Sequence, residues 1–126
     1  MGAIEPRQGP ILRIFQVQAM PGRATELLAK FRTTSAAVVD GHIGNQGYFF
    51  GQGVDGETDK LVFVSLWADI DAVKRRFGET WQNSYLPEGY EDLIANHVLL
   101  HIDATEGWHA DVESSDPVES SQSTSA

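Results

Sequence analysis

The sequence contains no cysteine, and this absence removes several kinds of chemistry at once. Disulfide bonds, thiolate catalysis and metal sites with cysteine ligands are all excluded. A protein that makes no use of disulfides is typical of a reducing compartment, so we expect it in the cytoplasm.

Long apolar stretches are also missing. No run of 18 apolar residues is present, so the sequence predicts no membrane-spanning helix and no membrane partner. The first ten residues lack the apolar middle of a secretory signal. We interpret residues 1–10, rich in glycine and proline, as a flexible leader.

Positive charge is scarce as well. The net charge is −9, of which −4 falls on residues 111–126, where four acids have no basic neighbour. Residues 1–110 carry the remaining −5, and such a surface does not favour a nucleic-acid partner. The one basic cluster, residues 74–76, closes a predicted helix, where positive charge complements the helix dipole. Residues 105–126, rich in Ser, Asp and Glu, predict a disordered acidic tail.

Between these ends, residues 11–104 predict one domain with the order strand, helix, strand, strand, helix, strand. Asp55-Gly56 is a hairpin turn signal between the two middle strands, and Asp69 and Gly78 suit the start and end of the second helix. This order is that of the α+β, ferredoxin-like βαββαβ fold. The expected elements are the strands 11–20, 43–53, 61–67 and 95–104 and the helices 23–40 and 69–77.

Two of the expected strands are apolar on both faces. Residues 61–67 are apolar at almost every position, and residues 98–102 are similar. Two helices cover only one face of a sheet, and the chain has no further element for the other. Burying one such apolar side chain stabilises a protein by about 1.5–3 kcal/mol relative to leaving it exposed. A second copy of the chain would bury these side chains, and we therefore predict a homodimer.

The chain resembles the antibiotic biosynthesis monooxygenase domain family over residues 11–103. The resemblance rests on Pro21-Gly22 before the first helix, Gly41 after it, the stretch from Val64 through Trp67 to Val73, and a closing strand that contains His101. It implies a dimeric α/β barrel with a cavity between helices and sheet. It further implies oxidation of a planar phenolic, quinol or polyketide-like small molecule by dioxygen, with no cofactor and no metal.

Chemical reasoning assigns candidate residues to this reaction. A phenol must lose a proton, and the resulting anion must be stabilised by hydrogen-bond donors in an apolar cavity. Trp67 and His101 are the catalytic candidates, as indole N–H donor and proton acceptor. For each candidate, packing is the alternative role. The candidate substrate-binding residues are Gln16, Gln18, Phe63, Trp81 and Tyr85.

Two alternatives remain open at this point. The same cavity would serve a non-catalytic protein that binds a small aromatic ligand. A haem-binding or haem-degrading protein is a further alternative, although the first strand has no Asn and the second helix has no His, which haem-degrading members carry there. On a helix, His97 and His101 would be spaced to bind one metal ion. The segment is predicted to be a strand, where the two residues lie about 13 Å apart and cannot share an ion.

Overall fold

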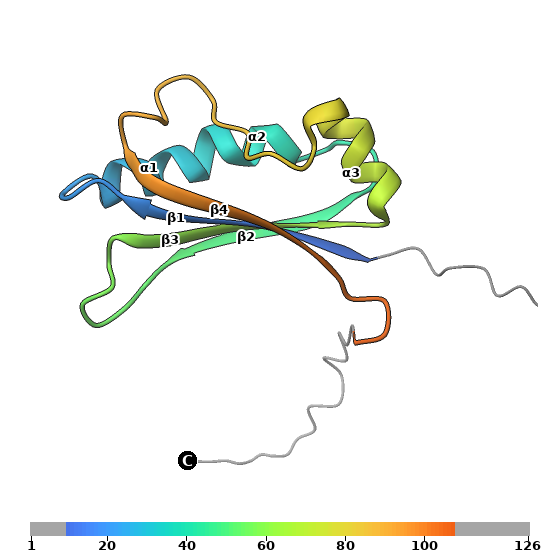
Figure 1. The fold of residues 1–126 in the computed structure, drawn as a ribbon, viewed down its shortest axis with the longest axis horizontal. Helices are drawn as coiled ribbons and strands as arrows, with labels where there is room; N and C mark the ends of the chain where they lie inside the picture. Colours follow the sequence, from blue (N-terminus) through green and yellow to red (C-terminus); the bar gives the residue numbers. More distant parts are fainter. Residues whose placement is uncertain (1–9, 108–126) are drawn as a thin grey trace, which may run out of the picture.

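The computed structural model describes residues 10–107, which contain a four-stranded antiparallel sheet (Figure 1). The strand order is β2-β3-β1-β4, so β1 lies at the centre between β3 and β4. This topology confirms the predicted α+β, ferredoxin-like fold, and each predicted strand boundary falls within two residues of the observed one. The strands are β1 (Ile11–Ala19), β2 (Asn45–Gln52), β3 (Lys60–Trp67) and β4 (Ile94–Asp103).

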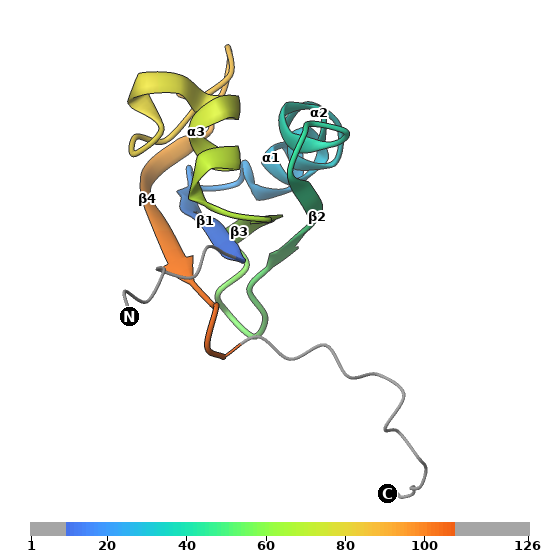
Figure 2. The same ribbon diagram turned by 90° about the vertical axis from the view of Figure 1, so that its right-hand side faces the viewer.

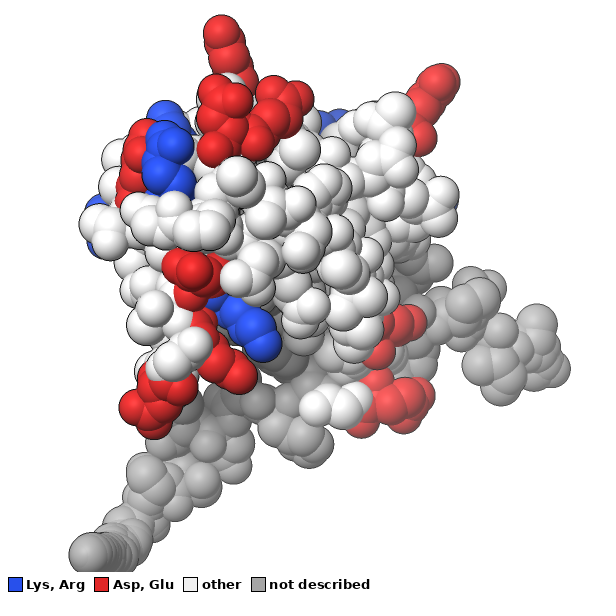
Figure 3. Space-filling model, turned by 60° about the vertical axis from the view of Figure 1, so that its left-hand side comes forward, with Lys and Arg blue, Asp and Glu red and all other residues white. Residues whose placement is uncertain are grey.

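The predicted leader (1–10) and tail (105–126) fall almost entirely outside the described residues and stay predictions. Within residues 10–107, no helix has both the length and the apolar character that crossing a membrane requires. On the face drawn in Figure 3, acidic side chains are spread around a broad uncharged area, and basic side chains are few.

The first helical region runs without a break through three segments. These are α1 (Ala24–Lys30), a π-helical segment (Phe31–Ser35) and α2 (Ala36–Val39). The sequence predicts one helix weakened at Thr33-Thr34-Ser35, and the wider π turn falls on those residues. Such turns often occur at functional sites, and here the turn holds the buried side chain of Ser35 toward the protein interior.

The second helix, α3 (Ile70–Phe77), begins and ends at the residues that the sequence predicts. The Asp69 carboxylate accepts a hydrogen bond from the Ala72 backbone N–H over 2.9 Å, which caps the first turn. Gly78, with φ of 75°, ends the helix in a conformation that favours glycine. A short 3₁₀ turn (Gly78–Thr80) then leads into the irregular segment before β4.

Both helical regions lie on the same face of the sheet, and the core fills the space between them (Figures 1 and 2). Its centre is an aromatic cluster in which the Phe31 and Phe63 rings meet edge to face, 5.6 Å apart. A hydrogen bond from Arg76 Nε to the Val38 carbonyl joins α3 to α2 over 2.5 Å. The fully buried members of the core include Leu27, Phe31, Trp67, Val73, Tyr90 and Leu93.

The opposite face of the sheet, here called the open face, is apolar and carries no covering element among residues 10–107 (Figure 2). Phe49 is 61% exposed and Val98 is 50% exposed, which is unusual for such large apolar side chains. The face therefore has the composition of an interface rather than of a solvated surface. Its apolar side chains are Leu12, Ile14, Phe49, Val62, Val64, Leu66, Val98, Leu100 and Ile102.

The loop before β2 gives a first testable prediction, at Gly44. Its φ is +88°, and a Cβ atom there would lie 2.4 Å from the Ala72 Cβ of α3. Gly44→Ala is therefore expected to lower the free energy of unfolding by about 2–4 kcal/mol, which combines backbone strain and overpacking. Urea denaturation measures the change.

The matched control is Gly22→Ala. Gly22 has a similar φ of +78°, but no atom lies within 4 Å of the added carbon. Only the backbone strain of about 1–2 kcal/mol is then expected. Equal losses in the two variants would contradict the packing of this loop against α3.

Candidate functional site

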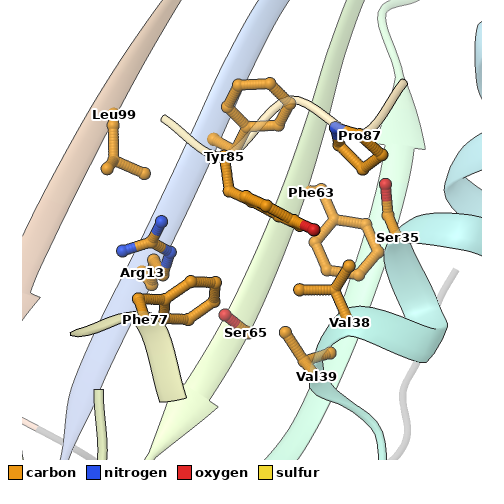
Figure 4. Close-up of a pocket in the computed structure, with 11 residues that line it drawn as sticks. Arg13, Ser35, Val38, Val39, Phe63, Ser65, Phe77, Tyr85, Pro87 and Leu99 are labelled. Atoms are coloured by element: carbon orange, nitrogen blue, oxygen red, sulfur yellow. The ribbon is translucent and has the colours of Figure 1, made fainter. Parts of the chain in front are cut away.

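A cavity lies between the helices and the sheet, with β1 and β3 as its floor (Figure 4). The cavity volume is about 40 Å³, and the figure rises to about 420 Å³ when all space between the atoms and the adjoining open solvent is counted. The walls are mainly aromatic and aliphatic, which is typical of sites for small organic ligands. The lining residues are Arg13, Phe15, Ser35, Val38, Val39, Phe63, Ser65, Phe77, Tyr85, Pro87 and Leu99.

Arg13 is the charged residue of this lining, and it is only 5% exposed. The side chain comes from the beginning of β1, on the face that packs against the helices. Its guanidinium carbon lies 3.7 Å from the centre of the Phe77 ring, a cation–π contact. Nη1 donates to the Trp81 carbonyl over 2.6 Å, and Nη2 donates to the Asn83 carbonyl over 3.3 Å.

Within residues 10–107, no carboxylate pairs with Arg13. Burial, and secondarily the positive charge of Arg76, lowers the pKa of Arg13 to about 10. The guanidinium therefore keeps its charge at neutral pH, compensated only by carbonyl dipoles and an aromatic ring. A buried cation without a counter-ion among residues 10–107 is suited to binding an anion.

His101 lies beside Arg13 on the neighbouring strand β4, where the two residues are register partners. Its Nε2 is 2.9 Å from Arg13 Nη1 and acts as the acceptor, since a guanidinium only donates. Burial, followed by the positive charge of Arg13, lowers the pKa of His101 to about 4. The Trp81 ring packs edge-on against the imidazole, 5.0 Å away. His101 is therefore neutral at pH 7 and a weak base.

This depressed pKa predicts a pH dependence of stability. Below its ordinary pKa of about 6.5, the histidine of the unfolded chain takes up a proton, whereas native His101 stays neutral until about pH 4. The stability that His101 contributes is thus present above pH 6.5 and is lost as the pH falls toward 4. After allowance for solvent screening, the loss from pH 7 to pH 5 is about 1 kcal/mol. Chemical denaturation of the wild type and His101→Gln measures it, and equal pH slopes would contradict it.

Trp67 lies at the end of β3 and is completely buried. Its indole N–H donates to the Ser65 hydroxyl oxygen over 2.8 Å, and its ring packs edge-on against Phe77, 5.9 Å away. The residue does not line the cavity, although Ser65 and Phe77 both do. Any influence of Trp67 on a ligand is therefore transmitted through these two neighbours.

The predicted substrate-binding residues divide into two groups. Phe63 lines the cavity floor, and Tyr85, which is 52% exposed, lines the mouth. Trp81 borders the site through its carbonyl and its contact with His101. Gln16 and Gln18 lie on the open face of the sheet, and thus away from this cavity.

Several lining residues are absent from the sequence-based candidates, Arg13 above all. A signal was available, because Arg13 alternates with Phe15 and Val17 on the face of β1 that packs against the helices. A charge at such a position is either paired or functional. Ser65 interrupts an apolar strand in the same way, whereas only the fold brings Phe77 to the guanidinium.

The second buried serine of the lining, Ser35, has a different environment from Ser65. Its hydroxyl lies 2.6 Å from the Tyr90 hydroxyl, which in turn donates to the Lys30 carbonyl over 3.1 Å. Since the phenolic proton is used in that second bond, Ser35 is the donor of the first. Burial raises the pKa of Tyr90, which keeps the phenol protonated. This network fixes the π-helical segment against the segment before β4.

A four-stranded antiparallel sheet with helices on one face and a cavity between the layers defines the class of this protein, a ferredoxin-like α+β domain. The antibiotic biosynthesis monooxygenase family model matches residues 10–82, and the chain belongs to this family. The predicted resemblance is thereby confirmed. Among curated proteins, no match was found.

Solved structures of low sequence identity share the fold. A protein from Caulobacter crescentus assigned to the antibiotic biosynthesis monooxygenases is 22% identical, with a TM-score of 0.59, and covers 77% of this chain and 91% of its own. PA3566 from Pseudomonas aeruginosa is also 22% identical, with a TM-score of 0.58 and coverages of 75% and 92%. A mutant of MhuD with two manganese protoporphyrin IX molecules bound per active site is 19% identical, with a TM-score of 0.62 and coverages of 80% and 100%.

Proposed function

We propose that this protein is a cofactor-independent monooxygenase that oxidises a planar phenolic or quinol-like molecule with dioxygen. The observation that carries the proposal is Arg13, a buried guanidinium without a carboxylate partner among residues 10–107, in an aromatic cavity. A phenolate is a flat anion, and it matches both the charge of the guanidinium and the aromatic walls.

The chemistry balances without a further reductant for an anthrone-type substrate. The substrate loses a proton, and the electron-rich anion passes one electron to dioxygen. The two radicals combine at the ring CH₂ carbon, and the hydroperoxide that forms there loses water to leave a ketone. One oxygen atom enters the product, the other leaves as water, and the substrate supplies all the electrons.

The residues of the cavity contribute to the first step of this sequence. Arg13 lowers the free energy of the substrate anion, because its charge is held in a poorly solvated environment. Phe63 and Phe77 provide ring walls, and the partly exposed ring of Tyr85 packs edge-on against Phe77. His101 is a poor proton acceptor here, so we propose that the substrate proton passes to solvent.

Oxygen uptake tests the proposal. The wild-type protein is mixed with an anthrone-type substrate in air, and with the enol methyl ether of the same compound, which has no acidic CH₂ group, as the matched control. The anthrone is expected to consume dioxygen at least tenfold faster with protein than without, and its product is expected to carry one oxygen-18 atom from labelled dioxygen. The methyl ether cannot ionise, so its rate should be unchanged. Equal rates with and without protein would contradict oxygenation.

A second candidate function, the binding of an aromatic anion without turnover, is favoured by a specific observation. The described lining contains no Asp, Glu or His side chain, and neighbouring His101 has a pKa of about 4. A protein without a good base is suited to a ligand that already carries its charge. Binding without oxygen uptake would identify this function.

The residues do not fit a haem group held by histidine. No histidine lines the cavity among residues 10–107, and α3 reads Lys74-Arg75-Arg76-Phe77 where haem-degrading relatives are expected to carry a histidine. The Nε2 atom of nearby His101 is already engaged by Arg13. We therefore derive no step through haem.

We also propose that the protein works as a homodimer whose two open faces pack together. The open face is large, apolar and uncovered among residues 10–107, and the family to which the chain belongs is typically dimeric. Gln16 and Gln18 would then lie in the interface. The cytoplasmic location stays a prediction.

A further inference from the structure

Ser65 holds a buried hydroxyl whose proton has no acceptor among residues 10–107. The side chain is 2% exposed, and its oxygen accepts the Trp67 indole N–H over 2.8 Å. A hydroxyl can both accept and donate, so the donor half of Ser65 remains unused in this part of the chain. Leaving a buried donor unpaired costs free energy, and a ligand that accepts from it would recover that cost.

Arg13 comes from the strand next to that of Ser65. Arg13 and Ser65 are register partners on the adjacent strands β1 and β3, and both side chains line the same cavity (Figure 4). Directly paired residues on one face of an antiparallel sheet have Cβ atoms about 5 Å apart. Three of the five N–H groups of the guanidinium make the contacts with Trp81, Asn83 and His101. The other two N–H groups remain able to donate to a ligand.

We propose that Arg13 and Ser65 together bind one negatively charged oxygen group of an aromatic ligand, and that Trp67 is a positioning residue that orients the Ser65 hydroxyl. The ligand class is an aromatic carboxylate or phenolate. The indole N–H occupies a lone pair of the hydroxyl oxygen and so directs the hydroxyl proton away from Trp67. This inference deepens the proposed function and rests on the same cavity, but it concerns binding rather than oxidation.

Ser35 supplies an internal comparison. It lines the same cavity and is similarly buried, but its hydroxyl proton is used in the bond to Tyr90. Of the two buried serines, only Ser65 therefore offers a free donor. Ser35→Ala is accordingly the matched control for Ser65→Ala.

Anaerobic calorimetric titration at pH 8 tests the inference with three probes of similar shape, which are 2-naphthoate, a nitro-substituted 2-naphthol that is ionised at this pH, and neutral 2-naphthamide. The wild type is expected to bind at least one of the two anions more tightly than the amide, and the arm that binds identifies the anion class. Ser65→Ala is expected to lower the affinity for that anion about tenfold, the effect of losing a hydrogen bond to a charged group. Amide affinity should change less than twofold, and Ser35→Ala should leave the anion preference unchanged.

Trp67→Phe separates orientation from packing. The substitution is expected to lower the affinity for the anion about threefold in the wild type. In Ser65→Ala it should have no effect on the anion preference, because the hydroxyl that Trp67 orients is then missing. Three results would each overturn the inference. The first is an equal loss of affinity for anion and amide in Ser65→Ala, and the second is a Trp67→Phe effect on anion affinity that is the same with and without Ser65. The third is a wild type that does not prefer the anion. Intact anion preference without oxygen uptake would instead count against oxygenation alone.

Discussion

Leu100→Asp is expected to convert the proposed dimer to a monomer. Leu100 lies near the middle of β4, points to the open face and is 39% exposed in a single protomer. In a dimer with twofold symmetry, the change places two carboxylates in an apolar interface, where an unpaired charge costs several kcal/mol. The dissociation constant should rise at least a hundredfold, which sedimentation velocity at micromolar concentration would show as a halved mass.

The control for this change is Ile43→Asp. Ile43 is 75% exposed in the loop between α2 and β2, where it borders Arg75 and Arg76 of α3 on the helical side of the sheet, so the same charge there should leave the proposed dimer intact. Circular dichroism confirms that both variants fold. A wild type that sediments as a monomer at tens of micromolar, or a Leu100→Asp variant that stays dimeric, would contradict the proposed packing of open faces.

Arg13→Met is expected to abolish oxygen uptake without lowering stability. Methionine fills a similar volume against Phe77 but carries no charge, so the substrate anion loses its counter-ion. Removing a preorganised charged donor from an active site lowers rates by about a hundredfold or more. Replacing a buried, poorly compensated charge by an apolar side chain is often neutral or stabilising, so the free energy of unfolding should stay equal or rise by about 1 kcal/mol.

A loss of oxygen uptake without a loss of stability would show that Arg13 acts in function rather than in holding the fold. Urea denaturation and oxygen uptake are measured on the same preparations, with Arg23→Met as the control. Arg23 is an exposed arginine paired with Glu26 on the surface, and its loss should change neither property. A loss of more than 2 kcal/mol in Arg13→Met would instead show that Arg13 holds the fold together, through its bonds to the Trp81 and Asn83 carbonyls.

Local patterns in the sequence were sufficient to predict the fold. Asp69 and Gly78 fix the ends of α3 by capping chemistry that acts within one turn. The Asp55-Gly56 turn has positive φ at both residues, as this turn signal predicts, and it lies within the connection of residues 53–59 between β2 and β3. Such signals depend on neighbours in sequence, which is why they can be interpreted without coordinates.

The site could be predicted only in part, because it depends on contacts between distant segments. Phe63 and Tyr85 were identified as candidates and line the cavity, and Trp67 was identified for its indole N–H, which the structure shows to be engaged by Ser65. The alternation of strand residues places Gln16 and Gln18 on one face, but does not tell which face holds the cavity. The low pKa of His101 depends first on its burial in the folded protein and then on the charge of Arg13, 88 residues away in sequence.

We propose that the Arg13 guanidinium, which has no carboxylate partner among residues 10–107, binds a flat anion in the apolar cavity. One comparison of binding affinities tests this most directly. Calorimetric titration without oxygen compares the naphthoate anion with the neutral naphthamide on the wild type and on Arg13→Met. The account predicts that the wild type prefers the anion by at least tenfold and that this preference disappears in Arg13→Met, while amide binding is kept. Equal affinity of the wild type for both compounds, or an anion preference that survives in Arg13→Met, would contradict it.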